Sequence, residues 1–169
     1  AFWMIQQAIA SDDPVIFLEH KVLYDTKGEV PEDSYEIPFG VGNVTREGAD
    51  VTVVAFGRMV LFANEVADRL KGEISVEVID PRTTSPLDTE LMLESVAKTG
   101  RLVVVDEANP ICSMASEVIS VIATDGHGLL KSAPRKITAP HTPVPAAPVL
   151  EKAYIPSQDT IEANIRAAF

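Results

Sequence analysis

Short β-branched apolar runs alternate with amphipathic helical segments through most of this chain, and this alternation strongly limits the folds open to it. The apolar runs predict strands at 51–56, 75–79, 101–106 and 135–138. Helical spacing of apolar residues predicts helices at 59–70, 88–98, 113–123 and 157–168. Strands that alternate with helices form parallel sheets covered on both faces. The expected fold class is α/β, with three layers, a mixed, mostly parallel sheet and helices on both faces.

The first forty residues follow another pattern. AFWMIQQAIA already reads as a helix at residue 1, which predicts that the chain is a piece of a longer protein. The sequence SDDP at 11–14 is typical of a helix end. We interpret the apolar run VIFLE at 15–19, which follows it, as a buried strand. The glycine and prolines of 25–40 indicate a linker. We therefore expect residues 1–24 to end one truncated domain and residues 41–169 to form the next.

Composition excludes some classes of function. A net charge of −11 argues against nucleic acid binding, which needs a basic face. No apolar run approaches the roughly 18–20 residues that span a bilayer, so no membrane segment is expected. Cys112 is the one cysteine, so no internal disulfide can form, and a cytoplasmic location is expected. We interpret its side chain as a small packing residue rather than an activated thiol.

Motif searches give no support to common catalytic sites. GxGxxG, the P-loop, CxxC, HExxH and GxSxG are all absent from the sequence. The histidines lie far apart in the sequence, and none has an evident orienting partner: His20, His127 and His141. A catalytic histidine is therefore disfavoured.

Carboxylates follow two of the predicted strands. Asp80 and the pair Asp106–Glu107 stand where these strands end, along one edge of a parallel sheet. Such a row could serve acid–base chemistry or bind a cation. Asp also caps turns and helices readily, and no nucleophile or phosphate loop stands nearby. We favour the capping role.

Several motifs, taken in order and spacing, resemble one enzyme family. They match the β subunit of thiamine-diphosphate-dependent 2-oxo acid dehydrogenases, especially its pyruvate and acetoin members. The stretches that carry the resemblance are DPVIFLEHKVLY at 13–24, VTVVAFGRMV at 51–60, VEVIDPRTTSPLD at 76–88, KTGRLVVVDEA at 98–108, PHTPVP at 140–145 and AYIP at 153–156.

The resemblance implies a transketolase-like C-terminal domain at 41–169, preceded at 1–24 by the end of a pyrimidine-binding domain. In the family, α and β subunits form a heterotetramer, and thiamine diphosphate and magnesium bind where α meets the pyrimidine domain of β. The cofactor-activating glutamate and the catalytic histidine lie upstream of residue 1. The resemblance thus implies an oxidoreductase part that serves subunit association and scaffold, without a complete active site or bound thiamine diphosphate.

Two further sites are implied by position alone. Some members hold potassium at a turn that matches 8–14 here, so the carbonyls of Ala8 and Ser11 and the side chain of Asp13 would be ligands. A plain acidic turn is the alternative. In some complexes the acyltransferase core docks its subunit-binding domain on the C-terminal carboxylate of β, here Phe169, and on an acid that is replaced by Ser132. That replacement weakens the expectation of docking.

Other functions stay open from the sequence. The chain could be the C-terminal domain of a transketolase or a 1-deoxyxylulose-5-phosphate synthase, which would need basic phosphate-binding residues. It could also be an acidic binding module without catalytic ancestry. The segment KTGRLVVVDEA favours the dehydrogenases, but the sequence does not decide between pyruvate, another 2-oxo acid and acetoin.

Overall fold

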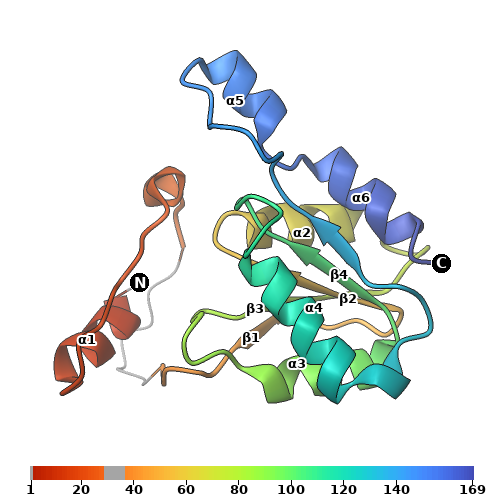
Figure 1. Cartoon of the computed structure of the whole chain (residues 1–169), viewed down its shortest axis with the longest axis horizontal. Coiled ribbons are helices and arrows are strands. Elements are labelled where there is room, and N and C mark those ends of the chain that lie inside the picture. The colour runs from red at the N-terminus through yellow and green to blue at the C-terminus, as the bar shows by residue number, and fades with distance from the viewer. Residues whose placement is uncertain (1, 29–36) are drawn as a thin grey trace.

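A five-stranded sheet forms the centre of the structure, a computed structural model that describes residues 2–28 and 37–169. The strand order is β1-β3-β2-β4-β5 (Figure 1). The strands are β1 (Asn43–Arg46), β2 (Val51–Ala55), β3 (Val76–Asp80), β4 (Leu102–Val105) and β5 (Arg135–Ile137). β1 pairs with β3 in the antiparallel direction, whereas the other neighbours are parallel.

Helices cover both faces of this sheet and enclose two separate apolar cores. α2 (Met59–Arg69) and α6 (Gln158–Arg166) pack on one face. α3 (Thr89–Thr99) and α4 (Met114–Asp125) pack on the other (Figure 1). The expected three-layer α/β class with a mixed, mostly parallel sheet is confirmed.

The local sequence explains why these elements form. Every residue of β2 and β4 is buried, as expected for parallel strands covered on both sides. The backbone N–H of Leu91 donates to Asp88 Oδ1 at 3.1 Å, so Asp88 caps the start of α3. Gly100 follows α3 in the left-handed region, at a φ of 76°, and ends it there.

A close approach at Gly48 fixes the turn between β1 and β2. A β-carbon at this position would lie 2.2 Å from the backbone nitrogen of Glu77. Such a distance is a severe clash with backbone atoms that cannot rotate away. Only glycine lets this turn lie against the start of β3.

One short strand, β1, and one short helix, α5 (Pro148–Tyr154), were not predicted from the sequence. β1 is an edge strand of four half-buried or exposed residues, so it lacks the apolar run that marks the other strands. α5 begins at the end of the proline-rich stretch 140–148, where no helix was predicted. Pro148 stands in its first turn, where a missing N–H costs nothing. Two 3-10 helices, η1 (Lys21–Asp25) and η2 (His127–Leu129), complete the structure.

The predicted buried strand at 15–19 is wrong. α1 (Phe2–Ala10) is helical as expected, but the residues after it form no strand, and Ile16 and Leu18 are each 87% exposed. α1 and this extended segment lie to one side of the layered domain (Figure 1), so no sheet edge of the described chain pairs with them. Much of the predicted linker, 29–36, lies outside the described residues.

Candidate functional site

The carboxyl edge of the sheet holds the carboxylates that the sequence singled out. Asp106 is 8% exposed, and its side chain accepts from the backbone N–H groups of Ala108 at 3.0 Å and Ala115 at 3.4 Å. It therefore caps the turn after β4 and the start of α4, which is the role we favoured.

Asp80 stands apart from Asp106 along the same edge. β2 separates the two strands, so two strand spacings, about 10 Å, lie between them. Asp80 Oδ1 accepts from the Arg82 backbone N–H at 2.9 Å. Burial raises the pKa of the Asp80 carboxyl above its usual value, although that hydrogen bond acts in the opposite direction. The described carboxylates of this edge do not form one cluster.

Glu107 meets a histidine that sequence reasoning left without a partner. His20 Nε2 lies 2.7 Å from Glu107 Oε2, and the two side chains are 28% and 24% exposed. A β-carbon added at Gly57, after β2, would lie 3.7 Å from the His20 ring. The N-terminal segment thus contacts the carboxyl edge of the sheet. With 87 residues between the two side chains, no spacing rule could have paired them.

The His20–Glu107 pair has the parts of an acid–base dyad, but no hydroxyl or thiol of the described residues forms a hydrogen bond with either side chain. Within the described residues, His20 Nδ1 and Glu107 Oε1 are buried without a hydrogen-bond partner. Cys112 is exposed, so its interpretation as a packing residue is wrong. His127 and His141 are exposed and lie in other parts of the domain. The arrangement fits a contact between two parts of the chain better than covalent catalysis.

The predicted cation turn lies at the end of α1. The Ser11 N–H donates to the Gln7 carbonyl at 3.1 Å, and the Asp13 N–H donates to Ser11 Oγ at 3.2 Å. Ala8 lies in the last turns of the helix, and Asp13 is exposed in the turn that follows. These contacts describe a helix-to-coil turn, so the cation site stays a proposal.

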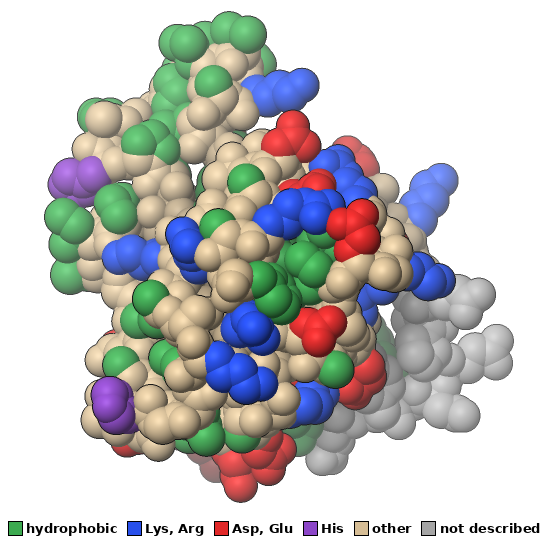
Figure 2. All heavy atoms as spheres, turned by 90° about the vertical axis from the view of Figure 1, so that its right-hand side faces the viewer, with side chains coloured by type: hydrophobic (Ala, Val, Ile, Leu, Met, Phe, Trp, Pro, Cys, Tyr) green, Lys and Arg blue, Asp and Glu red, His purple; other side chains and the backbone are tan. Residues whose placement is uncertain are grey.

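Phe169 and Ser132 lie together at one corner of the domain. The Arg101 guanidinium stacks on the Phe169 ring at 4.1 Å from its centroid, and Ser132 Oγ donates to the Ala168 carbonyl at 2.9 Å. Arg135 donates to the Ala167 carbonyl. Figure 2 faces the side on which the C-terminus lies in Figure 1, and Lys and Arg side chains gather over its centre.

The carboxylate of Glu77, buried between β3 and α3, was not predicted from the sequence to form a site. Glu77 is 1% exposed and accepts hydrogen bonds from Ser95, from Lys98 and, at 3.3 Å, from the Gly48 N–H. Burial opposes ionisation of Glu77, but these donors outweigh it and hold its pKa below the usual value. The hydrogen bond to Glu77 raises the pKa of Lys98. This cluster stabilises the layer between β3 and α3.

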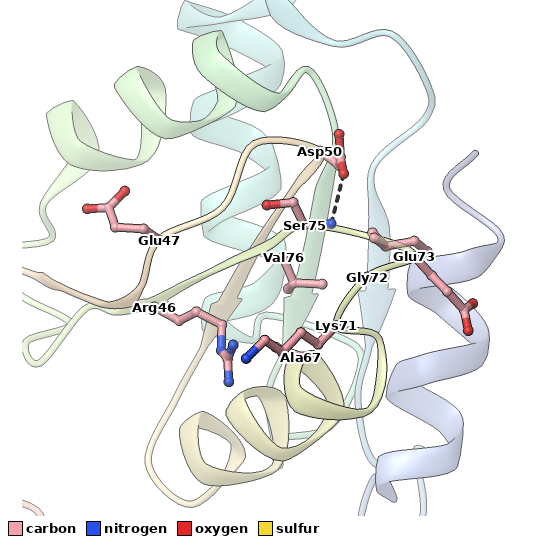
Figure 3. A pocket seen from close by; sticks show the side chains of 10 residues that line it. Arg46, Glu47, Asp50, Ala67, Lys71, Gly72, Glu73, Ser75 and Val76 are labelled. Atoms are coloured by element: carbon pink, nitrogen blue, oxygen red, sulfur yellow. Dashed lines mark hydrogen bonds between the residues drawn. The ribbon is translucent and has the colours of Figure 1, made fainter.

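A cavity of about 340 Å³ opens at the opposite, amino edge of the sheet. Its lining includes Arg46 from β1, Lys71 after α2 and Ser75 before β3. Figure 3 shows the Arg46 guanidinium and the Lys71 ammonium pointing toward one another. This edge carries no residue that the sequence analysis had selected.

Magnesium prefers converging oxygen ligands. No group of three or more His, Cys, Asp or Glu side chains within 2–28 and 37–169 could hold a metal ion. Over the same ranges, none of the helices has the length and apolar character needed to cross a membrane.

The strand order, the antiparallel edge strand and the two helical layers define an α/β domain of the transketolase C-terminal type. Residues 40–161 match the family described as "Transketolase, C-terminal domain". The chain belongs to this family.

Known proteins similar to this chain are dehydrogenase β subunits. It is 51% identical over 164 residues to the acetoin:2,6-dichlorophenolindophenol oxidoreductase subunit beta of Cupriavidus necator, covering 96% of this chain and 48% of that protein. It is 43% identical over 162 residues to the pyruvate dehydrogenase E1 component subunit beta of Leifsonia xyli, covering 95% and 48%. The resemblance to this group of enzymes is confirmed.

A solved structure supports the same fold. The chain matches a split-gene transketolase, described as an inactive beta4 tetramer, with a TM-score of 0.67 and 31% identity, covering 83% of this chain and 45% of that one. The chain spans about half the length of the curated relatives that it matches.

Proposed function

We propose that this chain is the C-terminal part of the β subunit of the decarboxylating component in a pyruvate or acetoin dehydrogenase complex. Its role there is subunit association and scaffold. The observation that carries this proposal is the match to dehydrogenase β subunits over 96% of the chain but only 48% of the relative. The described part of the chain supplies a folded core and contact surfaces but no nucleophile beside the His20–Glu107 pair.

Exposed apolar side chains support the association role. Contiguous apolar surface on a soluble domain typically marks a contact surface. Large apolar side chains are exposed on the N-terminal segment and on the arm that includes α5, at Ile9 (80% exposed), Ile16 (87%), Leu18 (87%), Val144 (67%), Val149 (76%) and Leu150 (57%). Figure 1 shows α5 projecting from the layered domain. These surfaces would be covered by the rest of the β subunit, by a second β subunit and by an α subunit in a heterotetramer.

The same proposal gives the chain its domain organisation. The pyrimidine-binding domain would end within residues 1–24. A linker at 25–40 would connect it to the transketolase-like C-terminal domain at 41–169. The exposed side chains of Ile16 and Leu18 in the extended segment at 15–19 would then contact the preceding domain. His20 and Glu107, 2.7 Å apart, would join the two domains beside the linker.

For the substrate, we favour acetoin over pyruvate. The identity to the acetoin oxidoreductase subunit, 51%, exceeds the 43% identity to the pyruvate dehydrogenase subunit over nearly the same length. The parent reaction would pass an acyl group to a lipoyl lysine. Thiamine diphosphate and magnesium would bind between α and the upstream half of β, and the location would be cytoplasmic.

Two finer sites belong to this proposal. Ala8, Ser11 and Asp13 would hold potassium at the turn after α1, where carbonyl oxygens suit a weakly hydrated cation. Phe169 would form part of the docking site for the acyltransferase core. Arg101 and Arg135 beside the C-terminal residues favour acidic rather than basic contacts from that partner.

Expression of a complete β subunit with its α subunit tests the function. The assay measures turnover of acetoin, pyruvate and branched 2-oxo acids, with the 169-residue chain alone as the control. We expect turnover, highest with acetoin, only when both complete subunits are present. Turnover by the 169-residue chain alone would contradict the proposal.

A further inference from the structure

We propose that the cavity at the amino edge of the sheet binds a small anion with one phosphate group, either free phosphate or a phosphate monoester. The cavity lies between the end of β1, the loop after α2 and the start of β3. It stands at the opposite end of the strands from the His20–Glu107 pair. The inference is independent of the function proposed above.

Two cations converge in this cavity. The Arg46 guanidinium and the Lys71 ammonium point toward one another across it (Figure 3). One terminal N–H group of the Arg46 guanidinium donates a hydrogen bond to Asp68. The Arg46 Nε is buried and has no hydrogen-bond partner among the described residues. The Lys71 ammonium forms no ion pair with any described residue. Facing like charges repel unless an anion lies between them.

The acids in the lining are already engaged elsewhere. Glu47 pairs with Lys98 at 3.2 Å, and Glu73 pairs with Arg166 at 2.7 Å. The Asp50 carboxylate accepts from the Ser75 backbone N–H at 2.8 Å (Figure 3). These pairs hold the lining carboxylates in other contacts, so the lining acids leave the Lys71 ammonium and the Arg46 Nε without a partner, although Asp68 pairs with the other end of the Arg46 guanidinium.

The shape and charge of the cavity select the class of ligand. Arg binds phosphate through several donors at once, and Lys adds a point charge. About 340 Å³ holds a phosphate group with a few further atoms.

Amide NMR on the 169-residue chain tests the site. The chain is titrated with inorganic phosphate, with glycerol 2-phosphate and with acetate, each at ionic strength matched by sodium chloride. We expect saturable shifts of the Gly72 and Ser75 amides with one or both phosphate probes. The probe with the higher affinity distinguishes free phosphate from an organic monoester.

Substitutions of Lys71 and Arg46 test whether these two side chains bind the phosphate. Lys71→Gln should weaken phosphate binding about tenfold, because it removes one charge-assisted contact. Lys71 is exposed, so its replacement leaves the core packing intact, and Arg46→Gln should act in the same direction. The matched control, Lys152→Gln on α5, should leave the affinity unchanged. Equal shifts with sodium chloride, equal affinity for acetate, or no effect of Lys71→Gln would each overturn the proposal.

Discussion

His20 Nε2 and Glu107 Oε2 lie 2.7 Å apart, and this contact connects the segment after α1 to the carboxyl edge of the sheet. The residues that follow His20 form η1, in which the Leu23 N–H donates to the His20 carbonyl at 2.9 Å. The pair therefore positions the chain just before the proposed linker. In a complete β subunit it would fix how the two domains meet.

Removal of this contact should release the segment without unfolding the domain. In Glu107→Ala, we expect faster hydrogen exchange at the Leu23 and Thr26 amides. The free energy of unfolding should change by no more than about 1 kcal/mol, because both side chains are partly exposed. Glu94→Ala, on the exposed side of α3, is the matched control. Unchanged exchange at both amides would show that the pair does not hold the segment.

The Glu77–Lys98 pair should make stability depend on pH. The lowered pKa of Glu77 means that its contribution is present above the unfolded value of 4.5 and is lost as the pH falls through the folded value. The raised pKa of Lys98 means that its own contribution is lost only at alkaline pH, above 10.5.

Lys98→Met tests this pair by urea unfolding. At pH 7 it should cost about 1–2 kcal/mol, less than a fully buried pair, because Lys98 is 45% exposed and the Ser95 and Gly48 donors remain. The difference from the parent chain should shrink as the pH falls below 4.5. A difference that is constant with pH would contradict a charged pair.

Gly48→Ala should destabilise the domain strongly. The added β-carbon would lie 2.2 Å from the Glu77 nitrogen, so the turn must move away from β3. We expect a loss of about 3 kcal/mol in the free energy of unfolding, the upper part of the range for overpacked sites. Gly28→Ala is the control, since nothing lies within 4 Å of its added β-carbon. Equal effects of the two changes would be inconsistent with this packing.

Asp80→Asn should increase the stability of the domain at neutral pH, because it removes a buried carboxyl group that is costly to ionise. Burial raises the folded-state pKa of Asp80, so ionisation disfavours folding as the pH rises through its usual value of 3.8. Asn keeps an acceptor for the Arg82 N–H but carries no charge. We expect the variant to be more stable than the parent by up to about 1 kcal/mol at pH 7, with no difference at low pH. An Asp80→Asn variant that is less stable than the parent at pH 7 would show that burial of the ionised Asp80 carboxyl does not destabilise the fold.

Sequence patterns predicted the elements that bury their own apolar faces. β2 and β4 are continuous apolar runs, and Asp88 caps the start of α3. β1 was missed because an edge strand needs no such run. The strand at 15–19 failed because the described chain offers no neighbour for it. Site contacts such as His20 with Glu107 depend on how distant segments meet, which local periodicity does not encode.

Under the proposed function, residues 41–169 provide subunit association rather than chemistry. Sedimentation velocity of a complete β subunit mixed with its α subunit tests it most directly, in comparison with a β subunit that ends before residue 41. Circular dichroism of the shortened subunit checks that its remaining domain is folded. We predict a heterotetramer with the complete subunit and no assembly with the shortened one. A shortened subunit that is folded and still forms the heterotetramer would contradict the account.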